Sequence, residues 1–464
     1  MRSSFLKLSL VSAAAALLLG ACSSMAPNYQ RPVAPVAGEF PFAPGNTGAQ
    51  AADVQWQEFF ADARLQQLIS AALANNRDLR AAVLNIEQAR AQYDVRRADG
   101  YPGVGLNASA SRAPAGNGDT STSYLVGLGI TAWEIDFFGR IASLSEAALA
   151  QYLGTEEGRK AAQIALVSTV ASTWLSFVAA EEQLELTRQT LATRAESLRL
   201  TRLRFDAGVS SELDFRLAQS LHETARVSFA QQQRQRALDL NTLALLTVAP
   251  VPAALQSAPA MASIALPDLP AGLPSDVLAR RPDVRQAEQQ LIAANANIGA
   301  ARAAFFPRIS LTAGVGTASG ALSGLFSSGS WAFTAAPQLL LPIFDAGRNN
   351  ANLQIANVSR DIAVAQYEKA IQSAFREVAD ALAGRATLSD QLQAQRNVVE
   401  AESVRLRLAQ LRYENGVSSY LDLLDAQRSA FAAQQALIQT RLQQLQNQVL
   451  LYRALGGGWT QPRG

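Results

Sequence analysis

Apolar and small polar residues alternate with period two in two parts of the chain, at about 103–136 and about 308–344. Such alternation predicts strands with one apolar face. Each run is about 9–11 residues long, the length at which a tilted strand spans a bilayer. In one run the apolar positions are Tyr124, Val126, Leu128, Ile130 and Ala132. Aromatic residues gather at the ends of the runs, as an interfacial girdle requires: Tyr101, Tyr124, Trp133, Phe305, Phe306 and Trp331. A soluble two-sheet β-structure is the alternative interpretation.

A seven-residue apolar repeat follows each pair of strand runs. The positions in the first copy are Val170, Phe177, Leu184, Leu191, Leu198 and Phe205. This spacing, in segments without Pro, predicts long coiled-coil helices at 140–205 and 348–413. Each helix is expected to fold back as a second one, at 212–248 and 420–455. A further helix at 62–98 is expected before the first strands, because that stretch lacks Pro and Gly.

The chain repeats itself. "RFDAGVSSELDF" begins at Arg204 and "RYENGVSSYLDL" at Arg412, 208 residues later. The same offset relates Gly139 to Gly347, and an offset of 205 relates Pro102 to Pro307. These four residues mark the expected junctions between strands and helices. Two similar repeats, 62–248 and 275–455, are therefore expected. A Pro-rich nonhelical segment at 249–274 separates them, and a tail follows at 456–464.

The duplicated stretch predicts the tips of two helical hairpins, at 206–211 and 414–419. A glycine ends the first helix of each hairpin. Ser211 and Ser419 begin the second helices as N-caps, and Asp214 and Asp422 follow three positions later in a capping-box arrangement. The expected tip surface consists of Gly208, Val209, Ser210, Gly416, Val417 and Ser418.

The first residues have the pattern of an export signal. Basic Arg2 and Lys7 precede an apolar run and the small residues "LGAC". This pattern predicts a lipoprotein signal peptide at 1–21 and lipid modification of Cys22, whose acyl chains would anchor the protein. An ordinary signal peptide with an accidental Cys is the alternative. Residues 22–61 are rich in Pro, Ala and Gly, and we expect an irregular leader there.

Charge and composition exclude several function classes. The net charge is only +2, so no large basic face for nucleic acid is expected. One His and one Cys exclude a His-rich metal site and an internal disulfide. No convincing nucleophile or general base stands out, so we expect neither an enzyme nor a cofactor other than the lipid on Cys22.

Four strands cannot close a barrel, and open strand edges are not tolerated in lipid. The chain is therefore expected to oligomerise, with each copy contributing strands to one barrel and helices to one tube. The expected fold class is mainly α with a membrane β-barrel portion.

Several motifs resemble the outer membrane factor family, the TolC-like channels, in its OprM-like lipoprotein branch. They are the lipobox, "YQRP" at 29–32, "RRPDV" at 280–284, "FFPRISL" at 305–311, "PIFDAGR" at 342–348, "RYENGVSSYLDLLDAQR" at 412–428 and "LYRALGGGW" at 451–459. The resemblance implies a homotrimer, with a twelve-stranded β-barrel in outer membrane lipid that is continuous with a periplasmic α-barrel. It also implies an exit duct for small molecules, working with a periplasmic adaptor and an inner-membrane RND-type transporter. A duct for type I protein secretion and a structural envelope coiled-coil protein are the alternatives.

Such a duct needs a closed resting end. Asp425 and Arg428 are i, i+3 neighbours after the second tip, whereas the first copy has Leu217 and Ser220 at these positions. The resemblance matches Leu421, Asp425 and Arg428 to the periplasmic constriction, and Asp422 to an aperture Asp. Asp214 and Tyr413 complete the candidate gate. The two aspartates after the N-caps are equally well explained as capping residues, and the Asp425–Arg428 pair as a solvated surface pair.

Overall fold

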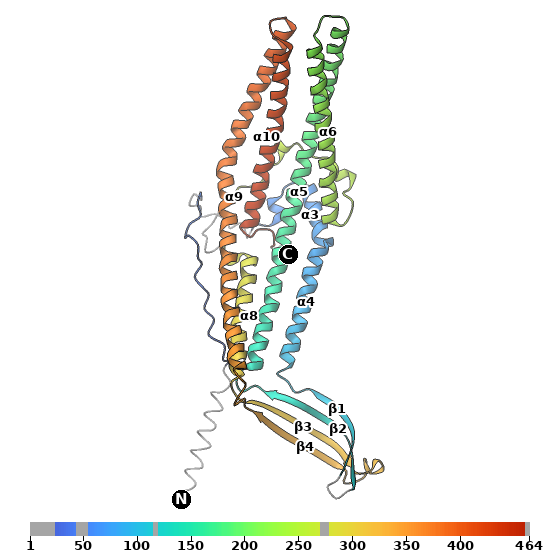
Figure 1. The fold of residues 1–464 in the computed structure, drawn as a ribbon, viewed down its shortest axis with the longest axis vertical. Coiled ribbons are helices and arrows are strands. Elements are labelled where there is room, and N and C mark those ends of the chain that lie inside the picture. Colours follow the sequence, from blue (N-terminus) through green and yellow to red (C-terminus); the bar gives the residue numbers. More distant parts are fainter. Residues whose placement is uncertain (1–23, 43–53, 115–118, 270–277, 460–464) are drawn as a thin grey trace. The chain divides into compact units, whose positions relative to one another are not determined.

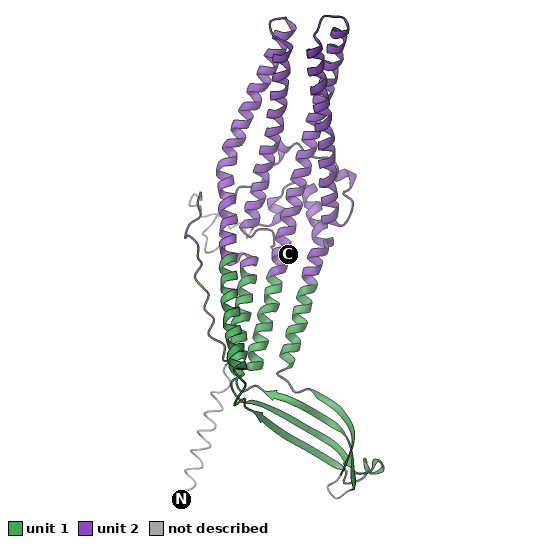
Figure 2. Ribbon diagram, viewed as in Figure 1, with its two compact units in different colours: residues 1–33, 84–157, 285–369 green, residues 34–83, 158–284, 370–464 purple. Residues whose placement is uncertain are grey.

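The computed structural model describes residues 24–42, 54–114, 119–269 and 278–459. The chain divides into two compact units (Figure 2). Unit 1 contains residues 1–33, 84–157 and 285–369, and unit 2 contains residues 34–83, 158–284 and 370–464. Each unit therefore combines segments from both sequence repeats.

Unit 1 contains an antiparallel sheet of four strands in the order β1-β2-β3-β4 (Figure 1). The strands are β1 (Val104–Pro114), β2 (Thr120–Ile135), β3 (Arg308–Ser319) and β4 (Trp331–Leu340). β2 pairs with β3, so the two repeats join in the middle of the sheet. Among the described residues, β1 and β4 each have one neighbouring strand, and their outer edges are unpaired.

The strand β2 differs from the expected pattern in length and in phase. It has 16 residues, more than the expected 9–11. The register between β2 and β3 shifts between Ile130 and Trp133, and Ala132 adopts a positive φ of 49°. The prediction that the alternation continues to Ala132 is therefore wrong. A β-bulge after Ile130 shifts the alternation, so the residues that follow it no longer lie on the face that the earlier pattern predicts.

Four long helices follow the expected pattern closely. They are α5 (Arg140–Asp206), α6 (Glu212–Thr247), α9 (Arg348–Glu414) and α10 (Tyr420–Ala454), and in Figure 1 they form two hairpins. Val248 and Leu455 cap the ends of α6 and α10. Within the described residues only α5 is long and apolar enough to cross a membrane by length and composition. More than half of its apolar window is buried in the protein, so core packing accounts for that composition.

The helix expected at 62–98 is two helices. α3 (Ala63–Asn75) is followed by the single residue Asn76, and α4 (Arg77–Ala98) begins directly after it. The Asn76 side-chain oxygen accepts hydrogen bonds from the backbone N–H groups of Asp78 (3.0 Å) and Leu79 (3.1 Å). Its amide nitrogen donates to the backbone oxygen of Leu246 (3.2 Å). Asn76 therefore acts as an N-cap that also binds α6. The sequence did not predict this break, because the residues around Asn76 are polar and compatible with one continuous helix.

Two segments expected to be irregular contain short helical turns. α2 (Trp56–Phe59) lies within the leader, and η2 (Ala253–Gln256) and η3 (Met261–Ser263) lie between the repeats. α2 places Phe59 against Tyr452, with the ring centroids 4.2 Å apart. These rings join the core of unit 2, whose largest buried side chains include Trp174 and Phe177. Burial of aromatic surface therefore fixes a segment that its composition alone marked as loop.

The beginning of the leader lies along α8 (Pro282–Ala303) within unit 1. Three residues of α8, each seven apart, hold it: Glu288, Asn295 and Arg302. Glu288 accepts hydrogen bonds from Tyr29 (3.0 Å) and Arg31 (2.7 and 2.8 Å). Asn295 donates to the backbone oxygen of Pro27 (2.7 Å), and Arg302 donates to that of Met25 (3.2 Å). The leader therefore runs antiparallel to α8, and we call these three residues the leader track.

Candidate functional site at the hairpin tips

Both hairpin tips have the local geometry that the duplicated sequence predicts. Gly208 and Gly416 adopt positive φ values of 74° and 70°, which glycine adopts without strain. After the first helix, the N–H of Val209 donates to the oxygen of Arg204 (2.9 Å), and that of Gly208 donates to Phe205 (2.9 Å). This is the Schellman pattern of helix termination, and the second tip repeats it.

Asp214 and Asp422 are capping residues in the structure. The Ser211 hydroxyl accepts from the N–H of Asp214 (3.1 Å), and the Asp214 carboxylate accepts from the N–H of Ser211 (3.3 Å). Ser419 and Asp422 make the same two hydrogen bonds, both 3.2 Å long. The two carboxylates thus have a structural role at the helix starts, while their role in a gate stays a prediction.

Asp425 lies between two arginines. Arg428 approaches one carboxylate oxygen at 2.7 Å, as its i, i+3 position predicts. Arg405, on the other helix of the hairpin, binds the second oxygen and also contacts Glu402 at 3.1 Å. The hydrogen bond from Arg405, with a smaller contribution from Arg428, holds the pKa of Asp425 below its usual range. Asp425 is therefore ionised at neutral pH.

Arg405 was not among the candidate gate residues, although its position in the sequence carries a signal. Arg405 precedes the tip glycine Gly416 by eleven residues, and Asp425 follows it by nine. In a helical hairpin such positions lie at nearly the same level. The two helices form a groove of about 790 Å³ beside this network, and it includes Leu421, whose exposed fraction is 59%. The structure thus brings Leu421, Asp422 and Asp425 to one groove.

Tyr413 connects the second hairpin to the first. Arg204 of α5 donates to the Tyr413 hydroxyl (2.6 Å), and its guanidinium lies 5.7 Å from the ring centroid. The neighbouring Tyr420 has its hydroxyl 2.8 Å from that of Ser197, also on α5. Tyr420 was not a candidate site residue. Its signal was an asymmetry between the repeats, because Glu212 occupies the equivalent position in the first copy.

The junction residues lie at the ends of the strands in unit 1. Pro102 precedes β1 and Pro307 precedes β3, whereas Gly139 and Gly347 precede α5 and α9. The two glycines have positive φ values of 68° and 86°. Near them, Glu134 of β2 binds Arg140 at 2.7 Å and also binds Arg308. This ion-pair cluster, which was not expected, fastens the first residue of α5 to two strands.

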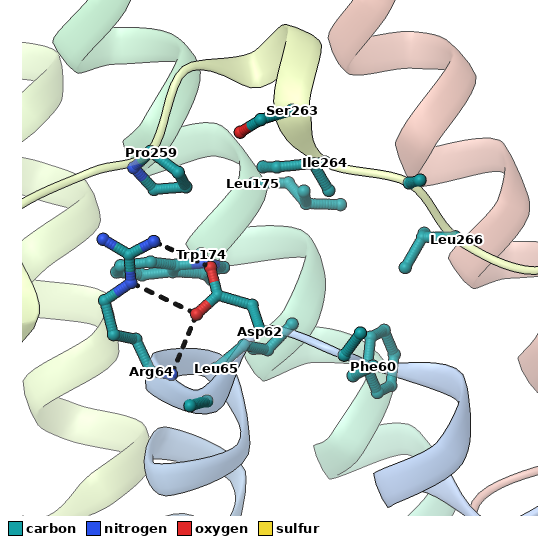
Figure 3. Close-up of a pocket in the computed structure, with 13 residues that line it drawn as sticks. Phe60, Asp62, Arg64, Leu65, Trp174, Leu175, Pro259, Ser263, Ile264 and Leu266 are labelled. Atoms are coloured by element: carbon teal, nitrogen blue, oxygen red, sulfur yellow. Dashed lines mark hydrogen bonds and ion pairs between the residues drawn. The ribbon is translucent and has the colours of Figure 1, made fainter.

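A separate apolar pocket of about 520 Å³ lies in unit 2 (Figure 3). Phe60, Trp174 and Leu175 line it, together with residues of the segment between the repeats. Asp62 caps α3 by accepting from the N–H of Arg64 (2.8 Å), and it also pairs with the Arg64 guanidinium. That guanidinium lies 6.0 Å from the Trp174 ring centroid. These contacts fasten the start of α3 to the core.

In the part of the chain that the structure describes, no group of three or more His, Cys, Asp or Glu side chains could hold a metal ion. The predicted signal peptide at 1–21 and the lipidation site Cys22 lie outside the described residues.

The family model for outer membrane efflux proteins matches residues 68–247 and 273–457. The probable efflux pump outer membrane protein TtgC of Pseudomonas putida is 48% identical, over 97% of this chain and 96% of that protein. The outer membrane protein OprJ of Pseudomonas aeruginosa is 47% identical, over 97% and 95%.

Solved structures have the same fold. The open state of the Neisseria gonorrhoeae MtrE outer membrane channel matches with a TM-score of 0.87 and 43% identity, over 94% of this chain and 99% of that one. A membrane protein from Pseudomonas aeruginosa matches with a TM-score of 0.88 and 45% identity, over 94% and 98%. The chain therefore belongs to the outer membrane efflux protein family.

Proposed function

We propose that three copies of this chain form a gated duct through which a tripartite pump exports small molecules across the outer membrane. The family consists of outer membrane efflux proteins, which are channels and not enzymes. Relatives at 48% identity are named for antibiotic efflux and for toluene efflux. These names support small molecules, rather than secreted proteins, as the exported class. A periplasmic adaptor and an inner-membrane RND-type transporter complete the proposed pump.

The sheet of unit 1 is the observation that carries the proposal of an assembled barrel. Its four strands end in two unpaired edges, β1 and β4. Unpaired backbone groups cannot face lipid, so these edges need partners from other copies. Three copies joined edge to edge would give twelve strands, an even number within the range of membrane barrels. The helical hairpins of the same copies would then form the periplasmic tube.

We also propose that Cys22 carries an N-acyl chain and an S-diacylglyceryl group. The export pattern before Cys22 supports this modification. The leader track supports it too, because it holds Met25, three residues away, at the end of α8 that leads into β3. Lipid on Cys22 would therefore enter the membrane beside the strands.

The proposed gate consists of Leu421, Asp422, Asp425 and Arg428, with Asp214 and Tyr413 beside it. In a threefold assembly each of these residues occurs three times around the axis. The positive charges of Arg405 and Arg428 compensate the negative charge of the ionised Asp425 carboxylate. Leu421 supplies exposed apolar surface that can close the aperture. An adaptor that binds the open arrangement more tightly would shift the population toward it.

The proposed adaptor surface is the pair of tips, formed by Gly208, Val209 and Ser210 and by Gly416, Val417 and Ser418. Val209 and Val417 have exposed fractions of 75% and 66%. Each tip thus presents an apolar side chain that a partner can cover.

Single-channel conductance in planar bilayers tests this function. The double variant Asp425→Ala with Arg428→Ala should conduct more than the parent while keeping the mass of three chains in detergent. The matched control is Glu196→Ala with Arg199→Ala, which removes another exposed i, i+3 pair of 2.7 Å from α5. The control should conduct like the parent. Absence of any pore in all three proteins would refute the duct, and equal conductance of all three would place the constriction elsewhere.

A further inference from the structure

Asp239 is a buried acidic residue of α6, and none of the sites described above uses it. Its exposed fraction is 7%. Gln235, one turn earlier, donates a hydrogen bond of 3.0 Å to its Oδ1 atom. Its Oδ2 atom is buried and has no hydrogen-bond partner among the described residues. An ionised carboxyl in this place would leave an oxygen with negative charge unsatisfied, which is costly.

Asp239 belongs to the seven-residue repeat of a coiled-coil helix. The buried residues Ala218 and Ala225 precede it by 21 and 14 positions, so the three lie on one stripe of α6. The second repeat has an amide where the first has a carboxyl, and the two side chains have nearly the same shape. Adding 208 to the three positions gives Ala426, Ala433 and Asn447 of α10.

Asn447 shows what this position does in the second hairpin. Its Nδ2 atom donates to the backbone oxygen of Ala381 on α9 (2.9 Å). The residue equivalent to Ala381 is Thr173 of α5. A backbone oxygen accepts hydrogen bonds, so it favours a donor and disfavours a carboxylate beside it. The position opposite Thr173 therefore suits a side chain that donates, and an Asp side chain donates only when it is protonated.

The two hairpins differ at one neighbouring position. Gly384 leaves room for the Asn447 amide, because a Cβ atom at position 384 would lie 2.3 Å from the Asn447 Oδ1 atom. Ser176 is equivalent to Gly384, and its Cβ atom leaves no such room for an oxygen placed in the same way. The Asp239 Oδ1 atom accepts instead from Gln235 of its own helix. Oδ2 is then the oxygen that corresponds to the donating Nδ2 atom of the amide.

The surroundings of Asp239 offer little positive charge to compensate an ionised carboxyl. α5 has no acidic or basic residue from 161 to 180. α3, α5 and α10 contact α6, and their charged groups nearest the level of Asp239 have other partners. Burial therefore raises the pKa of Asp239, and the hydrogen bond from Gln235 is the one opposing contribution. The charged groups, with their partners in parentheses, are Glu181 (Arg236), Glu182 (Met261), Arg64 (Asp62), Arg441 (Ile264) and Arg453 (Glu377).

We infer that Asp239 is a proton-binding site of the first hairpin. Its Oδ2 atom takes up a proton from solvent when α5 and α6 pack, and the protonated carboxyl donates to the backbone oxygen of Thr173, as Asn447 donates to Ala381. When the proton leaves, the hydrogen bond is lost and a buried negative charge faces the α5 backbone. The first hairpin thus loses stability as the pH rises, whereas the amide of the second hairpin does not titrate. The site lies within one chain and does not depend on the proposed duct.

Two reciprocal variants of the full-length protein test this site through the urea midpoint as a function of pH. Because the folded-state pKa of Asp239 is raised, its stabilising contribution is full below the usual value of about 3.9 and is lost as the pH rises through the folded value. Asp239→Asn donates at every pH, so its midpoint should exceed that of the parent at about pH 7 and approach it in acid. Asn447→Asp should lower the midpoint at about pH 7 and lower it less in acid. The control is Asp390→Asn, at an exposed position of α9, which should keep the pH profile of the parent.

Infrared difference spectra provide a second measurement, which detects the proton itself. The spectrum of the parent minus that of Asp239→Asn should contain the carbonyl band of a protonated carboxyl at about pH 5, where an ordinary Asp is ionised. Absence of this band at about pH 5 overturns the inference. So does a difference in midpoint between Asp239→Asn and the parent that stays constant across the pH range. A loss in Asn447→Asp that is independent of pH also overturns it, because the equivalent position would then not favour a protonated carboxyl.

Discussion

Gly384 of α9 faces the Asn447 side chain of α10 so closely that a Cβ atom fits only if Asn447 or a helix moves. A Cβ atom at position 384 would lie 2.3 Å from Oδ1, 2.7 Å from Cγ and 2.9 Å from Nδ2 of Asn447. The same amide donates a hydrogen bond of 2.9 Å to the backbone oxygen of Ala381. Replacing Gly384 with Ala therefore forces Asn447 to rotate away or the two helices to separate.

Three contributions determine the change in the free energy of unfolding. Ala in a helix interior is more favourable than Gly by about 1 kcal/mol. Overpacking opposes this gain by about 1–3 kcal/mol, and the lost hydrogen bond removes about 0.5–1.5 kcal/mol more. We expect Gly384→Ala to destabilise the protein by roughly 2 kcal/mol.

The measurement is the urea midpoint of the helical circular dichroism signal, at one protein concentration in detergent. Gly154→Ala is the control, because the nearest atom to its Cβ would be the Gln289 Cβ at an ordinary 3.4 Å. It should raise the midpoint, since it gains helix propensity without a clash. Adding Asn447→Ala to Gly384→Ala should recover most of the loss, because the clashing amide is gone. A Gly384→Ala midpoint at or above that of the parent would refute the reasoning.

Three further predictions concern the ion pairs, the leader and the lipid. Burial disfavours the Asp283 carboxylate, but hydrogen bonds from Arg281 hold its pKa below the usual value of about 3.9. The Asp283–Arg281 interaction is therefore fully present above about pH 4 and is lost as the pH falls through the lower folded pKa. Arg281→Met should lower the urea midpoint at pH 7, and the difference from the parent should narrow below about pH 4; a constant difference would contradict this. Gly299→Ala would place a Cβ 2.6 Å from the backbone nitrogen of Ala26 and so push the leader away from α8. Proteinase K should then cleave the leader of this variant faster than that of the parent. An unchanged cleavage rate would contradict this. Cys22→Ala should abolish incorporation of radioactive palmitate, and equal labelling of the two proteins would place the lipid elsewhere.

The long helices could be predicted because their signals are local. The absence of Pro, the seven-residue spacing and the cap residues of each tip all act within a few turns of one helix. The pair Asp425–Arg428 could be predicted for the same reason, since i, i+3 residues share a helix face.

The remaining features depend on contacts between distant segments. Asn76 ends α3 where its side chain caps α4 and also reaches Leu246 of α6. The bulge at Ala132 depends on the register between strands of different repeats. Arg405 and Tyr420 acquire their roles only when the helices pack against one another. The sequence identified the candidate gate through the differences between its repeats, but it did not show which side chains surround that gate.

The leader track would also affect how quickly the copies find one another. Three residues span at most about 10 Å, so lipid on Cys22 would lie close to the end of α8. A copy would then be tethered to the membrane surface before its strands find partners. Tethering replaces a search through the volume of the periplasm with a search in a plane, which raises the effective concentration of the copies for one another. The unpaired edges β1 and β4 would thus spend less time exposed, and the acyl chains would act as a kinetic aid to barrel closure as well as an anchor.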